Sequence, residues 1–129
     1  MTLLLATYLS CDCIKEVEDP ADRLPSAVES DYLAMLNEPG VPPHKLLLKV
    51  GTICSIMRNL SIEKGLVKNA RVRILELHSH IVKVELLHSS SSSTDDRTFY
   101  LPRINFDFHP HYTSWTVERR QLFCSSCFN

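Results

Sequence analysis

Hydrophobic and polar positions alternate with a period of two along much of the second half of the chain. The alternation is clearest in residues 70–77 and 81–88, where Val72 and Ile74 fall on one face of the first segment. Because successive side chains of a strand point to opposite faces of a sheet, this pattern predicts two strands. The short connection at residues 78–80 indicates that they form a hairpin.

Four further segments have the β-branched, aromatic and apolar composition of strands. One of them is interpreted as a bent strand or two short ones, because Gly51 at its centre is typical of a bend or bulge. Pro102 indicates an edge or a bulge in another, since proline cannot donate a hydrogen bond to a sheet. The four segments are residues 2–13, 45–57, 98–108 and 115–123.

Glycine, asparagine and serine mark the turns between these strands. Residues 59–64 are interpreted as a turn or a single helical turn. Gly65 and Asn69 are expected to have positive φ, because glycine lacks a Cβ and asparagine tolerates the left-handed region. Residues 89–96, five serines followed by Thr-Asp-Asp, indicate a flexible surface loop.

One short helix is predicted to begin near Ser26. Ser26 and Glu29 have the spacing of a capping box, in which each side chain bonds a free backbone N–H of the first turn. Pro39 and Gly40 cannot continue a helix, so it should end near Asn37. Four apolar residues follow the cap at roughly helical spacing, namely Val28, Tyr32, Met35 and Leu36.

The predicted fold is mainly β: a small SH3-like antiparallel barrel preceded by one strand and one short helix. Few, short strands can bury one face by forming such a barrel. At 129 residues, the chain is long enough for one domain. We divide it into an acidic lead-in (residues 1–43), the barrel (residues 44–121) and a divergent tail (residues 122–129).

The formal net charge of −1 conceals an uneven distribution of charge. Residues 1–43 have a net charge of −6, residues 44–83 of +6 and residues 84–129 of −1. A basic middle third fits a surface that faces a polyanion, but it also fits a solvated face that neutralises the acidic third within the fold. The candidate phosphate-binding residues cluster around one turn and the strand after it: Arg58, Lys64, Lys68, Arg71 and Arg73.

The sequence has no run of about 18 or more apolar residues, so no contact with a membrane is expected. The apolar start of the chain lacks the basic residues of a secretory signal and is interpreted as a strand. The odd number of cysteines, five, argues against a disulfide framework and favours free thiols in a reducing intracellular compartment.

No catalytic constellation is recognised in the sequence. With only three glycines, the chain has no Gly-rich loop that could hold the phosphates of ATP, and we expect no ATPase activity from it alone. Cys124 and Cys127 have metal or redox spacing, and Cys11 and Cys13 could add two thiolates. A small zinc-binding domain therefore stays an open alternative, although no metal or cofactor site is predicted.

The aromatic residues are concentrated late in the chain. They fit packing in a core, stacking on nucleic-acid bases, or docking of a protein partner. The last possibility makes a stand-alone protein-interaction module a second alternative. The residues are Phe99, Tyr100, Phe106, Phe108, Tyr112 and Trp115.

Residues 32–121 resemble the PIF-type (petite integration frequency) DNA helicases, in particular their Helitron-transposon-like members. Several short motifs in the family's order carry the resemblance. They are Pro42-Pro43-His44-Lys45-Leu46, Leu48-Lys49-Val50-Gly51, Met57-Arg58-Asn59-Leu60, Lys64-Gly65-Leu66, Ala70-Arg71, Leu101-Pro102-Arg103-Ile104 and Arg119-Arg120-Gln121.

The resemblance implies a 2B domain, an SH3-like module inserted in the second motor domain of the helicase. Such a domain would be a non-catalytic accessory of an ATP-dependent DNA helicase, in contact with single-stranded DNA or with the neighbouring motor domains. Among the matched residues, Arg58, Lys64 and Arg71 are the expected DNA contacts, whereas Asn59 and Gly65 fit turn geometry. ATP and magnesium would be bound by the motor domains, since the sequence has no Walker segments.

The same resemblance implies a nuclear location and the family's roles in DNA repair, recombination and telomere maintenance. Two departures from the family pattern stand out. Lys68-Asn69 replaces the usual Asn-Gly, and after Gln121 the chain continues as Leu-Phe-Cys-Ser-Ser-Cys-Phe-Asn in place of a helicase motif. We therefore expect a truncated fragment of a helicase.

Overall fold

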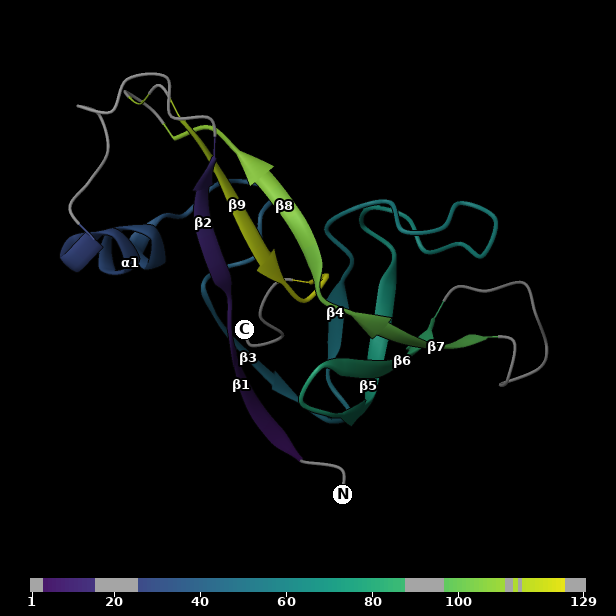
Figure 1. The fold of residues 1–129 in the computed structure, drawn as a ribbon. Helices are drawn as coiled ribbons and strands as arrows, with labels where there is room; N and C mark the ends of the chain where they lie inside the picture. The colour runs from purple at the N-terminus through teal and green to yellow at the C-terminus, as the bar shows by residue number, and fades with distance from the viewer. Residues whose placement is uncertain (1–3, 16–25, 88–96, 111–112, 114, 125–129) are drawn as a thin grey trace.

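The computed structural model describes the whole chain except residues 1–3, 16–25, 88–96, 111–112, 114 and 125–129 (Figure 1). The described part is mainly β, with one short helix, and all its strand pairs are antiparallel, as predicted. The elements are β1 (Leu5–Leu9), β2 (Cys11–Lys15), α1 (Ser26–Met35), β3 (Lys45–Lys49), β4 (Ile53–Ser55), β5 (Arg71–Leu77), β6 (Ile81–Leu86), β7 (Thr98–Pro102), β8 (Ile104–Phe108) and β9 (Thr116–Gln121).

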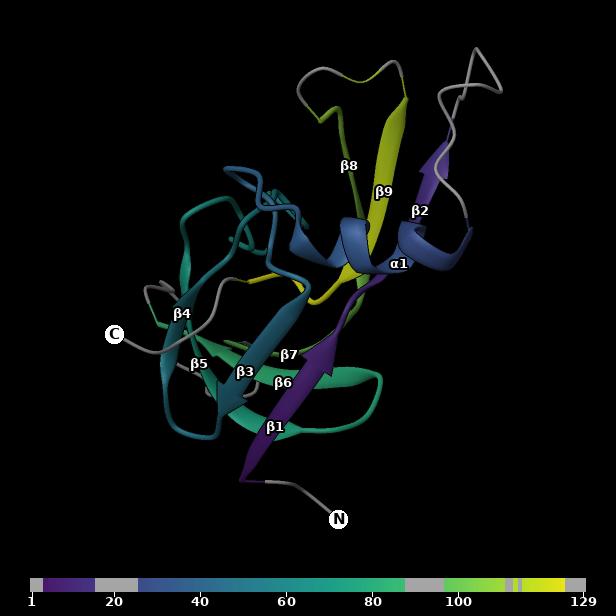
Figure 2. The ribbon, with the colours of Figure 1, turned by 90° about the vertical axis from the view of Figure 1, so that its left-hand side faces the viewer.

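Hydrogen bonding divides these strands among three sheets. The orders are β1-β3, β2-β9-β8 and β4-β5-β6-β7. Figure 2 shows the β2-β9-β8 sheet rising from the rest of the molecule, with α1 lying across it. Closure of the sheets into a single barrel stays a prediction.

The strand expected over residues 2–13 is in fact two strands that belong to different sheets. β1 pairs with β3, whereas β2 pairs with β9 more than 100 residues along the chain. The chain changes partner at Ser10, whose N–H donates to His44 O at 2.7 Å. The prediction of one continuous strand was wrong here, because the polar Ser10 is buried against His44, which lies 34 residues away in the sequence.

The larger hydrophobic core lies among β1 and β3 to β7. The predicted hairpin of β5 and β6 is present, with a bulge between Ile74 and Glu76. Tyr8 from β1 and Phe123 from beyond β9 are buried in the same core, so both ends of the described chain pack with the strands between them. Its fully enclosed side chains include Leu46, Leu48, Ile56, Val72, Ile74, Leu77, Val82, Val84, Leu122 and Phe123.

The smaller core joins α1 to the β2-β9-β8 sheet. Leu33 of the helix packs there with Phe108, Trp115 and Val117. Tyr32 meets Trp115 edge to face, with the ring centroids 5.9 Å apart. The helix ends where predicted, but Met35 is 77% exposed, so its apolar side chain is not part of the buried face.

Both predicted positive-φ turns are confirmed. Gly65 has φ +82° and Asn69 has φ +75°, and Gly51 at the predicted bend has φ +91°. Gly51 separates β3 from β4, so residues 45–57 form two short strands, one of the two arrangements expected. The loop predicted at residues 89–96 lies outside the described residues.

Candidate nucleic-acid interface

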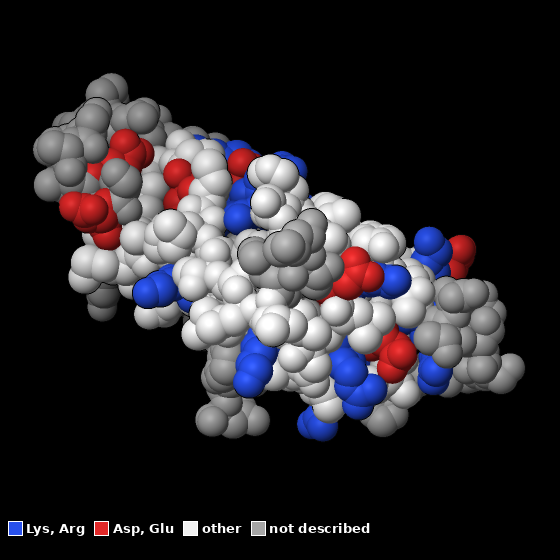
Figure 3. Space-filling view, turned by 90° about the horizontal axis from the view of Figure 1, so that it is seen from below, with Lys and Arg blue, Asp and Glu red and all other residues white. Residues whose placement is uncertain are grey.

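The five basic residues selected from the sequence lie in three separate places. Arg58 and Lys68 line an open groove, and Lys64 lines a smaller hollow. Arg71 and Arg73 lie on the exposed face of β5, where Arg73 forms an ion pair with Glu85 at 3.5 Å. On the face shown in Figure 3, Lys and Arg side chains are scattered among uncharged and acidic residues. The basic middle third of the sequence is therefore not a single patch on that face.

The groove has a volume of about 1110 Å³ and runs along β8, facing the loop after β4. Four basic residues line it, because Arg103 and Arg120 join Arg58 and Lys68. Three acidic residues also line it, but two of them are paired with Lys15, which contacts Asp107 at 3.5 Å and Glu118 at 3.0 Å. The hydrogen bond to Glu118 raises the pKa of Lys15, so this pairing holds at neutral pH. The groove thus retains guanidinium and ammonium groups for an anionic ligand.

Arg58 is anchored within the groove. Its Nη1 donates to Asn105 O on β8, and its guanidinium carbon lies 5.9 Å from the centre of the Phe106 ring. Arginine keeps its charge and its remaining N–H donors when it stacks in this way. Arg58 therefore presents a preoriented cation at the wall of the groove.

The loop that carries Arg58 and Lys68 is fixed by backbone hydrogen bonds. Asn59 Oδ1 accepts from the Lys68 N–H at 2.8 Å, so Asn59 has the turn role expected from the sequence. Leu60 N–H donates to Leu66 O at 2.8 Å, which closes the base of the turn. Because both ends of the loop are held, the backbone positions of Arg58 and Lys68 are fixed relative to one another.

Arg103 lies where the chain passes from β7 to β8. Its Nη1 donates to Leu9 O at 2.6 Å, and its guanidinium lies 5.8 Å from the Tyr8 ring centre. Tyr8 in turn donates its hydroxyl to His78 O at 2.8 Å, and burial raises the pKa of this phenol. Arg103 thus ties the end of β1 to the groove and has N–H groups left for a ligand.

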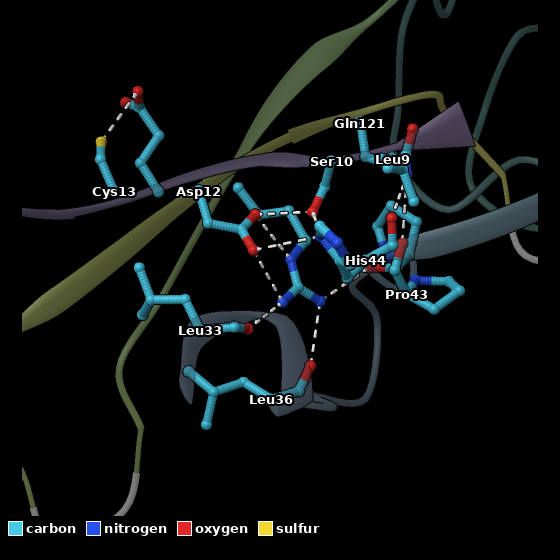
Figure 4. Close-up of polar contacts among 12 residues, drawn as sticks. Leu9, Ser10, Asp12, Cys13, Leu33, Leu36, Pro43, His44 and Gln121 are labelled. Atoms are coloured by element: carbon cyan, nitrogen blue, oxygen red, sulfur yellow. Dashed lines mark hydrogen bonds and ion pairs between the residues drawn. The ribbon is translucent and has the colours of Figure 1, made fainter. Parts of the chain in front are cut away.

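Arg119 has a structural role inside the protein, and Figure 4 shows its partners Asp12, Leu33 and Leu36. Its side chain is fully buried, and Nε donates to Asp12 Oδ1 at 2.9 Å while Nη2 donates to Asp12 Oδ2 at 3.2 Å. The remaining N–H groups donate to the carbonyls of Leu33 and Leu36 at the end of α1 and of Pro42 after it. Arg119 therefore fastens α1 and the following segment to the β2-β9-β8 sheet.

Gln121, two residues further along β9, has a similar supporting role. Its Nε2 lies 3.0–3.2 Å from the carbonyl oxygens of Tyr8, Pro43 and His44, and its Oε1 accepts from the Leu122 N–H. Since an amide has only two hydrogens, at least one of them is shared. Gln121 holds together β1 and the entry to β3.

Ser10, Asp12 and His44 lie beside Arg119. The Ser10 hydroxyl donates to Asp12 Oδ1 at 2.8 Å, and His44 Nδ1 lies 2.7 Å from the same hydroxyl. The arrangement resembles no hydrolase triad, because Ser10 and Asp12 both face the same ring nitrogen of His44, Nδ1, whereas a triad places the serine and the carboxylate at opposite ring nitrogens. Its polar groups are used for structure.

Sequence reasoning did not place Arg103 and Arg120 among the candidate phosphate contacts, although both belong to motifs noted there. The sequence did contain a signal for Arg120. Adjacent residues of a strand point to opposite faces, so one of Arg119 and Arg120 is expected to point outward. Nothing local, however, shows which of two adjacent arginines is buried. Only the pairing of Asp12 with Arg119 across β2 and β9 assigns the inward position.

The cysteines do not gather into one group within the described residues. Cys11 and Cys13 are exposed on β2, whereas Cys124 is buried in the larger core. No cluster of three or more His, Cys, Asp or Glu side chains in the described part of the chain could hold a metal ion. The helix that the structure describes is too short and polar to cross a membrane.

Residues 31–77 match the family model described as DNA helicase Pif1, 2B domain. The fold is similar to that of the Pif1 helicase from Candida albicans, with a TM-score of 0.62 and 15% identity over 95% of this chain and 29% of that one. Unliganded Pif1 from Bacteroides sp. gives a TM-score of 0.57 and 14% identity over 95% of this chain and 32% of that one. No curated protein sequence matches.

At these identities the structural likeness concerns the fold alone, and this chain spans less than a third of each of these helicases. The sequence match adds the family for the segment from the middle of α1 to the end of β5. Residues 31–77 thus match the Pif1 helicase 2B domain, within a chain whose fold is similar to that of a part of the Pif1 helicases.

Proposed function

We propose that this chain acts as a non-catalytic 2B-type accessory domain of an ATP-dependent DNA helicase and contacts single-stranded DNA through the groove along β8. The observation that carries the proposal is the convergence of Arg58, Lys68, Arg103 and Arg120 on one groove. Guanidinium and ammonium groups are the usual partners of backbone phosphates, and such contacts do not depend on base sequence. The match to the Pif1 2B domain supports DNA as the polyanion.

ATP binding and hydrolysis would belong to the motor domains of the parent helicase, together with magnesium. These motor domains are the second proposed partner. A structure titled for DNA unwinding at forked double-stranded DNA by two coordinating Pif1 helicases also shares this fold, with a TM-score of 0.52, 14% identity and coverage of 95% of this chain and 22% of that one. We extend the proposal to a Helitron-like, nuclear helicase, whose roles would lie in repair, recombination or telomere maintenance.

The experiment measures binding of a fluorescein-labelled oligodeoxythymidine by anisotropy at several salt concentrations. The groove variant replaces Lys68 and Arg120 with Gln, because both side chains are exposed and no described hydrogen bond or ion pair holds them. The matched control replaces Arg71 and Arg73 with Gln, which removes the same charge from the face of β5.

Loss of two phosphate contacts should weaken binding and reduce the slope of log K against log salt by about 1.4, at roughly 0.7 for each contact with a single strand. The β5 control should keep most of the wild-type affinity and slope. Equal effects of the two double variants would show that binding follows net charge and not the groove. Absence of binding by the wild-type chain at low salt would refute the DNA-contact role.

A further inference from the structure

A second hollow, of about 520 Å³, lies between β7 and the turn that follows Leu60. The half-buried apolar side chains of Leu60, Phe99 and Ile104 line it and pack against the larger core beneath. Lys64 stands over this surface, with Nζ 6.0 Å from the centre of the Phe99 ring. The hollow thus combines an apolar, aromatic wall with one cation at its rim.

The hollow is continuous with the cationic groove. Leu60 and Ile104 line both cavities, so the two adjoin at these side chains. The turn between them is held in place by the paired residues Ser61 and Leu66 and by the positive φ of Gly65. Both cavities are therefore parts of one preformed surface.

We propose that the hollow is a recess for one nucleobase of the single strand whose phosphates lie in the groove; this inference rests on the proposed function. A base offers a flat, largely apolar face that can pack on an aromatic ring, which is how proteins hold single strands without reading their sequence. The exposed Lys64 side chain would turn from the Phe99 ring to the phosphate next to that base, which leaves the ring free for the base.

Three observations favour a base over an extended peptide added to the edge of β7. The hollow opens into a groove lined by four basic residues, which suits a polyanion. In the hollow, Lys64 lies over the Phe99 ring, and side chains form the wall on both sides of the opening. The volume is within the range of ordinary ligand pockets.

The test uses the full chain and a set of oligodeoxythymidines of equal length, each with one abasic unit at a different position. The wild-type protein should bind the strand without an abasic unit roughly tenfold more tightly than the strand whose abasic unit falls at the recess. Base–aromatic stacking has about this effect on binding. The Phe99→Leu and Lys64→Gln variants test the aromatic wall and the cation separately. Lys45→Gln, on the exposed face of β3, is the charge-matched control.

Phe99→Leu should abolish the discrimination between based and abasic strands, and Lys64→Gln should weaken binding of both. Thermal melting of each variant checks that the fold is kept. If Phe99→Leu lowers the stability, Lys64→Gln remains an independent test. If the groove variant loses binding while Phe99→Leu discriminates like wild type, the recess is refuted and the groove stands. That result would also be expected of a hollow that holds a peptide. If the wild-type chain binds no strand, the proposed function and the recess both fail.

Discussion

Arg119 and Arg120 are neighbours on β9, yet Arg119 is completely buried against Asp12 and Arg120 is exposed at the groove. The strand therefore gives two identical side chains two different functions. The inward arginine fixes α1 and the segment after it, and the outward one offers its charge to a ligand. Substitutions at the two positions should separate stability from binding.

Arg119→Met should lower the free energy of unfolding by about 3–5 kcal/mol, because it leaves the Asp12 carboxylate buried without its partner. Arg120→Met should change it by less than about 0.5 kcal/mol, as expected of an exposed position. Urea denaturation monitored by Trp115 fluorescence measures both. Adding Asp12→Asn to Arg119→Met should recover part of the loss, since the unpaired charge is removed. Equal stability of the two single variants would contradict the structural role of Arg119.

Gly65 and Gly51 provide a second comparison. Both have positive φ, but a Cβ on Gly65 would lie 3.1 Å from Leu86 Cδ2, whereas a Cβ on Gly51 would meet no atom within 4 Å. Gly51→Ala should therefore cost about 1–2 kcal/mol from backbone strain alone. Gly65→Ala should cost more, because Leu86 in the core must also move. Thermal or urea unfolding ranks the two, and a smaller cost at Gly65 would show that the turn relaxes freely.

Local sequence patterns predicted the helix and the strands of this fold better than they predicted which strands pair with one another. The alternation in β5 and β6, the start of the helix near Ser26 and the positive φ at Gly65 each depend on near neighbours in the sequence, and all were found. The change of partner at Ser10 depends on His44 and on the distant β9, so no local pattern shows it.

The residues of the candidate site likewise divide into those whose proximity follows from local sequence and those that only the pairing of distant strands brings together. Arg58 and Lys68 lie in one loop, and their proximity could be predicted from the turn between them. Arg103 and Arg120 reach the same groove only because β8 and β9 pair and lie beside that loop. Arg71 and Arg73 are near in sequence, but the period of a strand directs them to the outer face of β5.

Cys13 should react slowly with iodoacetamide at neutral pH, although it is exposed. Burial of the thiol group raises the pKa of Cys13, and the nearby Glu118 carboxylate raises it further, with Sγ 3.9 Å from Oε1. Because only the thiolate reacts, the rate should rise as pH increases. Glu118→Gln should lower the Cys13 pKa and move this rise to lower pH. Peptide mass spectrometry measures the rate at Cys13 alone. Glu85→Gln, which removes a carboxylate elsewhere, should leave the profile unchanged; an equal shift would exclude a local effect of Glu118.

The outer face of β1 carries exposed leucines beside an open strand edge. Leu5 and Leu9 are 53% and 55% exposed, Leu4 just before the strand is 76% exposed, and among the described residues β1 pairs with β3 alone. An apolar edge strand is a template for pairing with another chain, and exposed apolar side chains favour association.

The isolated chain should therefore self-associate as its concentration increases. Leu5→Lys combined with Leu9→Lys should keep it monomeric, because two charges at the edge oppose pairing of strands. The matched control is Met35→Lys combined with Ile62→Lys, which adds the same charge at exposed apolar residues away from β1. Sedimentation velocity over a range of concentrations measures the mass of each. Wild-type protein that stays monomeric, or a control that dissociates it equally well, would show that β1 is not the surface of association.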